Sequence, residues 1–195
     1  MSTALLPARL MAGAIAPLPA IVRAAATTPT SAPTPCAAWD LGALARHLIF
    51  WSPFLAASGR RAEPIPVAST EPDVPLEGWP DAVVAGVNEV AAAWSDAAAW
   101  TGTTTMGGPD ALPAEMIGGM VLGELVVHGW DLARAAGVRA EWSQDVLVAT
   151  YEAVVGMAAQ GRQMGIFGPE VAVPADAPLL DRIAAATGRD PGWRA

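Results

Sequence analysis

Residues 113–136 have the sequence PAEMIGGMVLGELVVHGWDLARAA, which predicts a long helix. Pro113 suits the first helical position, where its missing N–H needs no partner, and Gly137 suits the left-handed residue that follows a helix. Glu124 and His128 are four positions apart, so on a helix both side chains leave one face about 6 Å apart along the axis. The segment therefore predicts a carboxylate and an imidazole side by side.

Glu124 lies in a run, 116–130, in which every other residue except His128 is apolar or glycine. An unpaired carboxylate buried there is strongly destabilising, so we expect something to compensate it. Three arrangements are open: Glu124 faces water, it pairs with protonated His128 as an ordinary helix contact, or both residues bind a cation. His47, in an apolar setting on a neighbouring helix, offers a third ligand. A His/Glu/His trio from two facing helices leaves a fourth metal position open, as in catalytic zinc sites.

Three further side chains are candidates for this site. Asp131 follows His128 by three positions on the same face, where its carboxylate could orient the imidazole. Trp51 and Trp130 each lie within a turn of a proposed ligand and are candidate substrate-binding residues. Their alternative role is core packing, which is what most buried aromatic side chains do.

The arginines and the single cysteine have alternative interpretations. Arg46, Arg134 and Arg189 are candidates to bind a carboxylate of an acidic substrate, and Arg46 is the one we assign to substrate binding. The alternative for each arginine is a solvated surface residue. The alternative for Asp131 is an ordinary polar residue or an ion pair with Arg46 or Arg134. We expect Cys36 to be a small buried hydrophobic residue rather than a catalytic thiol.

Outward from this segment, the chain is predicted to be helical throughout. The expected helices are an N-terminal one kinked near Pro17, then 41–57, 81–100, 113–136, 143–160 and a short one at 177–186. Asp40 and Ser143 are the expected N-caps. A surface loop is expected at 58–77, and a turn-rich crossing with room for a little extended structure is expected at 101–112. The prediction is an all-α, single-domain four-helix bundle over residues 1–195, with long crossing loops. We expect the bundle core at 33–160 and a C-terminal extension at 161–195 that carries the short accessory helix.

Composition excludes several classes of function. The chain has 195 residues, 53% of them hydrophobic, and a net charge of −8, so nucleic acid and anionic lipid are disfavoured as partners. All eleven cationic residues are arginines, which excludes lysine Schiff bases and the P-loop lysine. One cysteine forms no internal disulfide. Residues 1–26 are apolar, but prolines and two arginines interrupt them, so we expect a cytoplasmic protein without a signal peptide or membrane span.

Two groups of motifs carry a family resemblance. The first group comprises Thr34-Pro35-Cys36-Ala37-Ala38-Trp39-Asp40, Leu44-Ala45-Arg46-His47-Leu48 and residues 124–134. Its order and spacing resemble the actinobacterial mycothiol-dependent maleylpyruvate isomerase family, within the DinB-like superfamily. The tail resembles a single-domain branch of that family, on Phe167-Gly168-Pro169-Glu170-Val171, Pro174-Ala175-Asp176-Ala177-Pro178 and Thr187-Gly188-Arg189-Asp190-Pro191.

The resemblance implies a DinB-like four-helix bundle that binds a divalent metal ion through His47, Glu124 and His128. Zinc is the metal expected first, with nickel or iron as alternatives, and mycothiol is the implied cosubstrate. The founding isomerase of the family carries an additional C-terminal domain that contributes to its active site, and this chain ends without room for one. We therefore expect thiol activation rather than maleylpyruvate isomerisation itself.

These observations leave three hypotheses for the function. Coordination to a dication deprotonates a thiol, so the first is a mycothiol-using transferase or isomerase whose thiolate attacks a small electrophile. The same metal can instead lower the pKa of a bound water to about 7, which gives a metal-dependent hydrolase. The third is a non-enzymatic protein whose tryptophan-lined cavity binds a small apolar molecule. The expected assembly is a monomer or homodimer.

Overall fold

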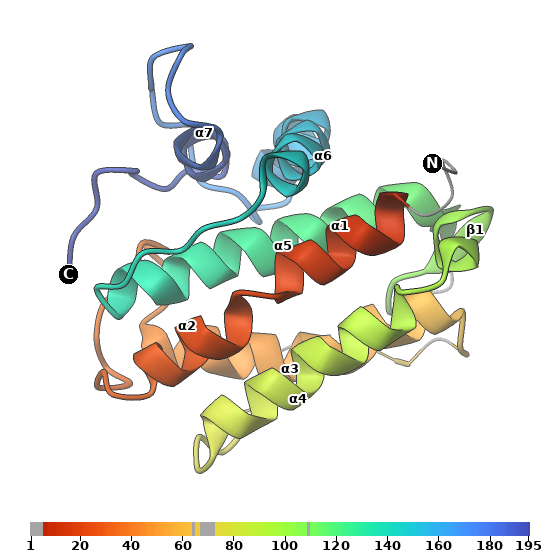
Figure 1. Cartoon of the computed structure of the whole chain (residues 1–195), viewed down its shortest axis with the longest axis horizontal. Coiled ribbons are helices and arrows are strands. Elements are labelled where there is room, and N and C mark those ends of the chain that lie inside the picture. Colours follow the sequence, from red (N-terminus) through yellow and green to blue (C-terminus); the bar gives the residue numbers. More distant parts are fainter. Residues whose placement is uncertain (1–5, 64, 67–72, 109) are drawn as a thin grey trace.

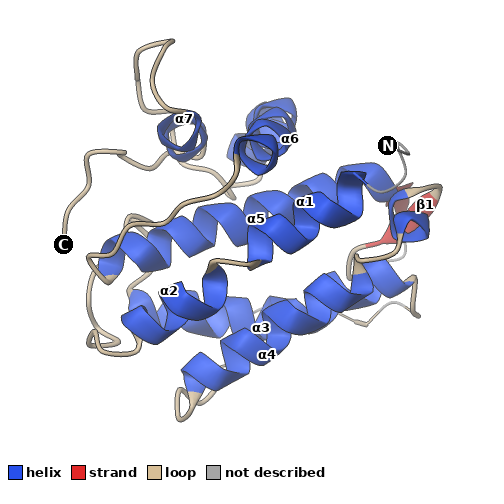
Figure 2. Ribbon diagram, in the orientation of Figure 1, coloured by secondary structure: helices blue, strands red, loops and turns tan. Residues whose placement is uncertain are grey.

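The computed structural model describes residues 6–63, 65–66, 73–108 and 110–195. Helix α5, Ala114–Ala135, lies between two groups of helices (Figure 1). One group contains α3, Leu41–Arg60, and α4, Trp79–Ala93; the other contains α6, Gln144–Gln163, and α7, Leu179–Ala186. Figure 2 shows how little of the fold is strand. The described residues form only a two-stranded sheet besides the helices, which confirms the all-α class.

The N-terminal segment forms two helices rather than one kinked helix. They are α1, Leu6–Ile15, and α2, Leu18–Ala25, and they separate at Pro17, which has no N–H to continue the helical hydrogen bonds. Met11 and Val22 are fully buried and belong to the main hydrophobic core. Residues 7–25 are apolar enough on average to suit a membrane span, but here their apolar side packs against the protein's own helices. The packed core therefore begins before residue 33.

Helices α3 and α4 pack closely because small residues line their contact. Asp40 caps α3 as predicted, accepting a hydrogen bond from the Ala43 N–H at 2.8 Å. A Cβ atom at Gly86 in α4 would lie 2.6 Å from Ser52 Oγ in α3, so only glycine allows this approach. α3 extends three residues beyond the predicted end at Ala57, because its end is set by Arg61 in the left-handed conformation.

The predicted helix at 81–100 is wrong over its last part, residues 94–100. α4 ends at Ala93, and a separate 3-10 helix, η2, follows at Ala97–Trp100. The side chain of Asp96 accepts a hydrogen bond from Ala98 N–H at 2.9 Å and so caps a new helical turn. The break lets Trp94 turn inward, where its indole N–H donates to the Leu55 carbonyl at 2.9 Å. Tertiary packing and a local cap therefore override the continuous helical pattern.

A short hairpin precedes α5 and corrects its predicted start. β1, Thr103–Thr105, pairs antiparallel with β2, Ala111–Pro113, within the segment predicted to be a turn-rich crossing. Pro113 pairs with Thr103 at the end of the sheet and therefore precedes the helix instead of occupying its first position. The other end of α5 is as predicted, because Gly137 follows it with φ of 66°.

The C-terminal half adds α6 and α7 across α5. α6 begins after Ser143 as predicted, but the Ser143 hydroxyl donates to the Asp145 carboxylate instead of capping a backbone N–H. The accessory helix expected at 177–186 is confirmed as α7. Of the loop predicted at 58–77, residues 64 and 67–72 lie outside the described part of the chain.

Candidate metal centre

The structure brings His47, Glu124 and His128 together. Nε2 of His47, on α3, lies 2.7 Å from Glu124 Oε1, on α5. Nε2 of His128, one turn further along α5, lies 3.6 Å from the same oxygen. One potential ligand atom from each of the three residues lies within 4.8 Å of the others. Ligands held tetrahedrally at the usual zinc distances are roughly 3.3 Å apart, which lies between the two distances from the histidines to Glu124 Oε1.

Asp131 orients His128. Its Oδ2 atom lies 3.0 Å from His128 Nδ1, and the Asp131 side chain is fully buried. A carboxylate accepts hydrogen bonds only, so in the neutral imidazole this contact assigns the proton to Nδ1 and the lone pair to Nε2. That lone pair faces the Glu124 carboxylate, which is also an acceptor. Two acceptors facing each other need a cation or a proton between them, and this is our structural reason for regarding the trio as a metal site.

Arg189 is the residue that holds Asp131. Its Nε and Nη2 atoms donate to the two oxygens of the Asp131 carboxylate at 2.9 Å each. Arg189 is only 6% exposed, so the expectation of a solvated surface arginine is wrong. The expected partners for Asp131, Arg46 and Arg134, do not fill this role. A buried carboxylate needs a cation, but the sequence does not say which arginine the tertiary structure brings to it.

The charges of the site are mutually compensating. In the metal-free site, burial alone raises the pKa of Glu124, but the charge of His128 in its protonated form and the hydrogen bond with His47 outweigh burial and lower that pKa to about 2. Burial also opposes ionisation of Asp131, yet the hydrogen bond from His128 and the charge of Arg189 lower its pKa. Both carboxylates are therefore ionised at neutral pH, and 24% of the Glu124 side chain remains exposed.

Trp39 and Trp51 form an aromatic wall beside the histidines. The Trp39 ring centroid lies 4.3 Å from that of His47 and 5.4 Å from that of His128. The Trp51 centroid lies 6.3 Å from that of His47, on the same helix. Trp51 is a candidate from the sequence, whereas Trp39 is not. The sequence signal for Trp39 is its position directly before the N-cap Asp40, because the cap fixes where the preceding residue lies relative to α3.

The remaining candidates lie elsewhere. Trp130 is two positions after His128, so it points about 200° away around α5, where it packs in the main core. Arg46 contacts the loop before α4, with its Nε 2.8 Å from Asp73 Oδ1 and 3.1 Å from the Val74 carbonyl. Cys36 is half-buried rather than fully buried, and burial raises the pKa of its thiol.

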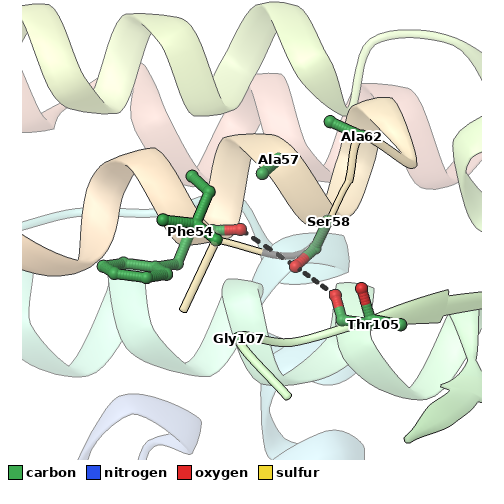
Figure 3. A pocket seen from close by; sticks show the side chains of 7 residues that line it. Phe54, Ala57, Ser58, Ala62, Thr105 and Gly107 are labelled. Carbon is green, nitrogen blue, oxygen red and sulfur yellow. Dashed lines mark hydrogen bonds between the residues drawn. The ribbon is translucent and has the colours of Figure 1, made fainter. Parts of the chain in front are cut away.

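Two hollows lie away from these three ligands. The one in Figure 3 is too small to hold a water molecule, and in it Ser58 Oγ lies 2.9 Å from the Phe54 carbonyl oxygen and 2.7 Å from the Thr105 carbonyl oxygen. The other is a groove of about 970 Å³ at the C-terminal end of α5, lined by residues that include Trp130 and Trp193. None of the three ligand residues lines either hollow.

Fold and site together define a helical protein with a candidate His/Glu/His metal centre built on α3 and α5. The family model of the mycothiol maleylpyruvate isomerase N-terminal domain matches residues 11–133, and the chain belongs to that family. No curated protein and no solved structure matches the chain. The match includes all three candidate ligands and Asp131, and it ends before α6, α7 and Arg189.

Proposed function

We propose that this protein is a mycothiol-using transferase or isomerase that acts on a small electrophile at a divalent metal ion, with zinc as the expected metal. The observation that carries the proposal is the convergence of His47, Glu124 and His128 on one point, within a chain of this family. We further propose that α3, α4, α5 and the N-terminal helices form a DinB-like four-helix bundle around that point.

The chain's own residues would hold the metal and shape its surroundings. His47 and His128 would bind through their Nε2 atoms and Glu124 through Oε1, while Asp131 keeps the His128 proton on Nδ1. A bound dication lowers the pKa of a coordinated thiol and so supplies a thiolate at neutral pH.

The surroundings support the same proposal. Three protein ligands leave a fourth position for a cosubstrate. The rings of Trp39 and Trp51 lie beside His47 and would provide apolar surface for a small substrate near the metal. A net charge of −8 favours small molecules over nucleic acid or anionic membranes as partners.

The test is thiol consumption by the metal-loaded protein. Purified protein is loaded with Zn²⁺ and incubated with mycothiol and, in turn, maleylpyruvate, an epoxide and a chlorinated nitrobenzene, while free thiol and product are measured. We expect metal-dependent turnover with at least one electrophile, abolished in Glu124→Gln and retained in Glu115→Gln, a matched change at the exposed start of α5.

Other outcomes separate the alternatives. Metal-dependent turnover that persists without thiol would identify a hydrolase instead, because water rather than thiol would then be the nucleophile. Absence of turnover at full metal loading, together with binding of an apolar dye that Glu124→Gln leaves unchanged, would overturn the proposal in favour of a binding protein.

A further inference from the structure

We propose that Arg189 is a positioning residue for the metal ligand His128 and acts through Asp131. This inference rests on the metal site of the proposed function, and it adds a part of the chain that the family match does not include. The side chain of Arg189 donates its hydrogen bonds to the Asp131 carboxylate and to the Thr187 carbonyl. Its charge also helps to lower the pKa of Glu124 through space, but the carboxylate of Asp131 is its hydrogen-bonded route to His128.

The geometry at Asp131 leaves the carboxylate little freedom. Oδ1 accepts from Arg189 Nε at 2.9 Å, and Oδ2 accepts from Arg189 Nη2 at 2.9 Å and lies 3.0 Å from His128 Nδ1. A planar guanidinium fork fixes the plane of a carboxylate, which a lysine ammonium cannot do. The fork thereby aims Oδ2 at the imidazole and leaves Nε2 of His128 facing Glu124.

Arg189 is itself held in place by its neighbours. Its Nη1 donates to the Thr187 carbonyl at 3.2 Å, and its backbone N–H donates to the Ala184 carbonyl at 2.9 Å, at the end of α7. Gly188, with φ of 86°, passes so close to Gly168 that a Cβ atom there would lie 2.5 Å from the Gly168 Cα. The guanidinium is therefore a fixed part of the fold.

Residues 187–193, here called the C-terminal strap, are held to α5 at a second point. Arg134 on α5 donates through Nη2 to the carbonyls of Pro191 and Trp193. Arg134 therefore holds the strap to which Arg189 belongs, and within the described part of the chain it makes no hydrogen bond with Asp131. Loss of Arg134 weakens only the attachment of the strap, whereas loss of Arg189 also removes the hydrogen bonds to Asp131. Arg134→Met is therefore the matched control for Arg189→Met.

The first measurement is Zn²⁺ affinity by competition with a chelator, in a double-mutant cycle. We expect Arg189→Met and Asp131→Asn each to weaken Zn²⁺ binding about 10–100-fold, as is usual for residues that orient a metal ligand. If Arg189 acts through Asp131, the double variant binds about as weakly as Asp131→Asn alone. Additive losses, or unchanged affinity in Arg189→Met, would overturn the inference.

The cycle also guards against loss of folding. Arg189→Met leaves a buried carboxylate without its cation, whereas the double variant with Asp131→Asn removes both charges together. Circular dichroism of each variant establishes that it is folded before its affinity is compared. Arg134→Met is expected to keep Zn²⁺ affinity within about twofold of the parent, since it leaves the Asp131 contact intact.

The second measurement follows the imidazole directly in metal-free protein. The chain has two histidines, so nitrogen-15 NMR of the imidazoles reports on two rings only. We expect Nδ1 of His128 to carry a proton in the parent and in Arg134→Met, because the Asp131 carboxylate lies 3.0 Å from it and accepts hydrogen bonds only. We expect a mixture of Nδ1 and Nε2 tautomers in Arg189→Met, partly restored in Arg189→Lys.

The two measurements distinguish failure of this inference from failure of the proposed function. A parent protein that binds Zn²⁺ normally while Arg189→Met keeps both its affinity and its tautomer would overturn only the role of Arg189. A parent protein that binds no metal would overturn the proposed function, whereas the tautomer measurement would still support or contradict the positioning of His128.

Discussion

Nε2 of His47 lies 2.7 Å from Oε1 of Glu124, although 77 positions separate the two residues. The contact joins α3 to α5 at a point where the surrounding helix faces are apolar. It makes one carboxylate oxygen the common neighbour of two imidazoles, since His128 approaches the same atom. The predictions below test whether this arrangement binds a metal ion and what it contributes to stability.

The first prediction concerns metal content. We expect about one divalent metal ion per chain, as usual for three protein ligands on one cation, and loss of at least about 100-fold in affinity in Glu124→Gln. Elemental analysis of the purified, untagged protein measures the stoichiometry. Glu115→Gln is the control, and a parent that stays metal-free after incubation with zinc, nickel, iron and manganese would refute the site.

The second prediction concerns stability after metal removal. A metal present at 100 times its dissociation constant stabilises the folded state by about 2.7 kcal/mol, which for a domain of this size raises Tm by roughly 5–10 °C. We expect this shift in the parent when Zn²⁺ is added after dialysis against a chelator. Differential scanning calorimetry measures it, and a shift of equal size in Glu124→Gln would show that Zn²⁺ binds elsewhere.

The third prediction concerns acid sensitivity of the metal-free protein. The pKa of Glu124 is lowered from its ordinary value of 4.5 to about 2 in the folded state. A group with a depressed folded pKa contributes stability that is complete above about pH 4.5 and is lost as the pH falls towards about 2. Between these limits the free energy of unfolding of the parent should therefore fall more steeply with pH than that of Glu124→Gln. The difference in slope corresponds to uptake of up to about one additional proton on unfolding. Urea denaturation at a series of pH values measures the two slopes, and parallel curves would contradict the prediction.

The fourth prediction compares two helical glycines. A Cβ atom at Gly118 would lie 2.3 Å from the Trp100 ring, whose indole N–H is already committed to the Trp94 carbonyl. Gly118→Ala should therefore destabilise the protein by about 1–3 kcal/mol. Gly156 in α6 has nothing within 4 Å, so Gly156→Ala should stabilise it by about 0.5–1 kcal/mol. Chemical denaturation tests both, and equal effects would show that Trp100 moves aside.

Local signals predicted most of the secondary structure. The Asp40 cap and Gly137 act within one helical turn of themselves, and both positions are as predicted. The errors arise where a longer-range contact competes. The helix expected to run to Trp100 breaks because Trp94 bonds to α3, and Pro113 joins a hairpin strand that the local pattern does not require.

The sequence by itself determined that Glu124 and His128 share one face, since helical periodicity places residues four apart together. The same periodicity places Trp130 off that face, because two positions correspond to about 200° of rotation, which argues against the substrate-binding role expected for Trp130. The order of motifs further pointed to the family that the match to residues 11–133 shows.

Only the tertiary structure decided which residues from distant segments complete the site. His47 meets Glu124 because α3 and α5 pack together, and Arg189 reaches Asp131 from 58 positions away because Gly188 and the end of α7 turn the strap inward. Periodicity describes one helix at a time, whereas the pairing of buried charges depends on which helices pack against each other. The physical reason is that a buried carboxylate requires a cation nearby, but several arginines in the chain satisfy that requirement equally well until the fold selects one.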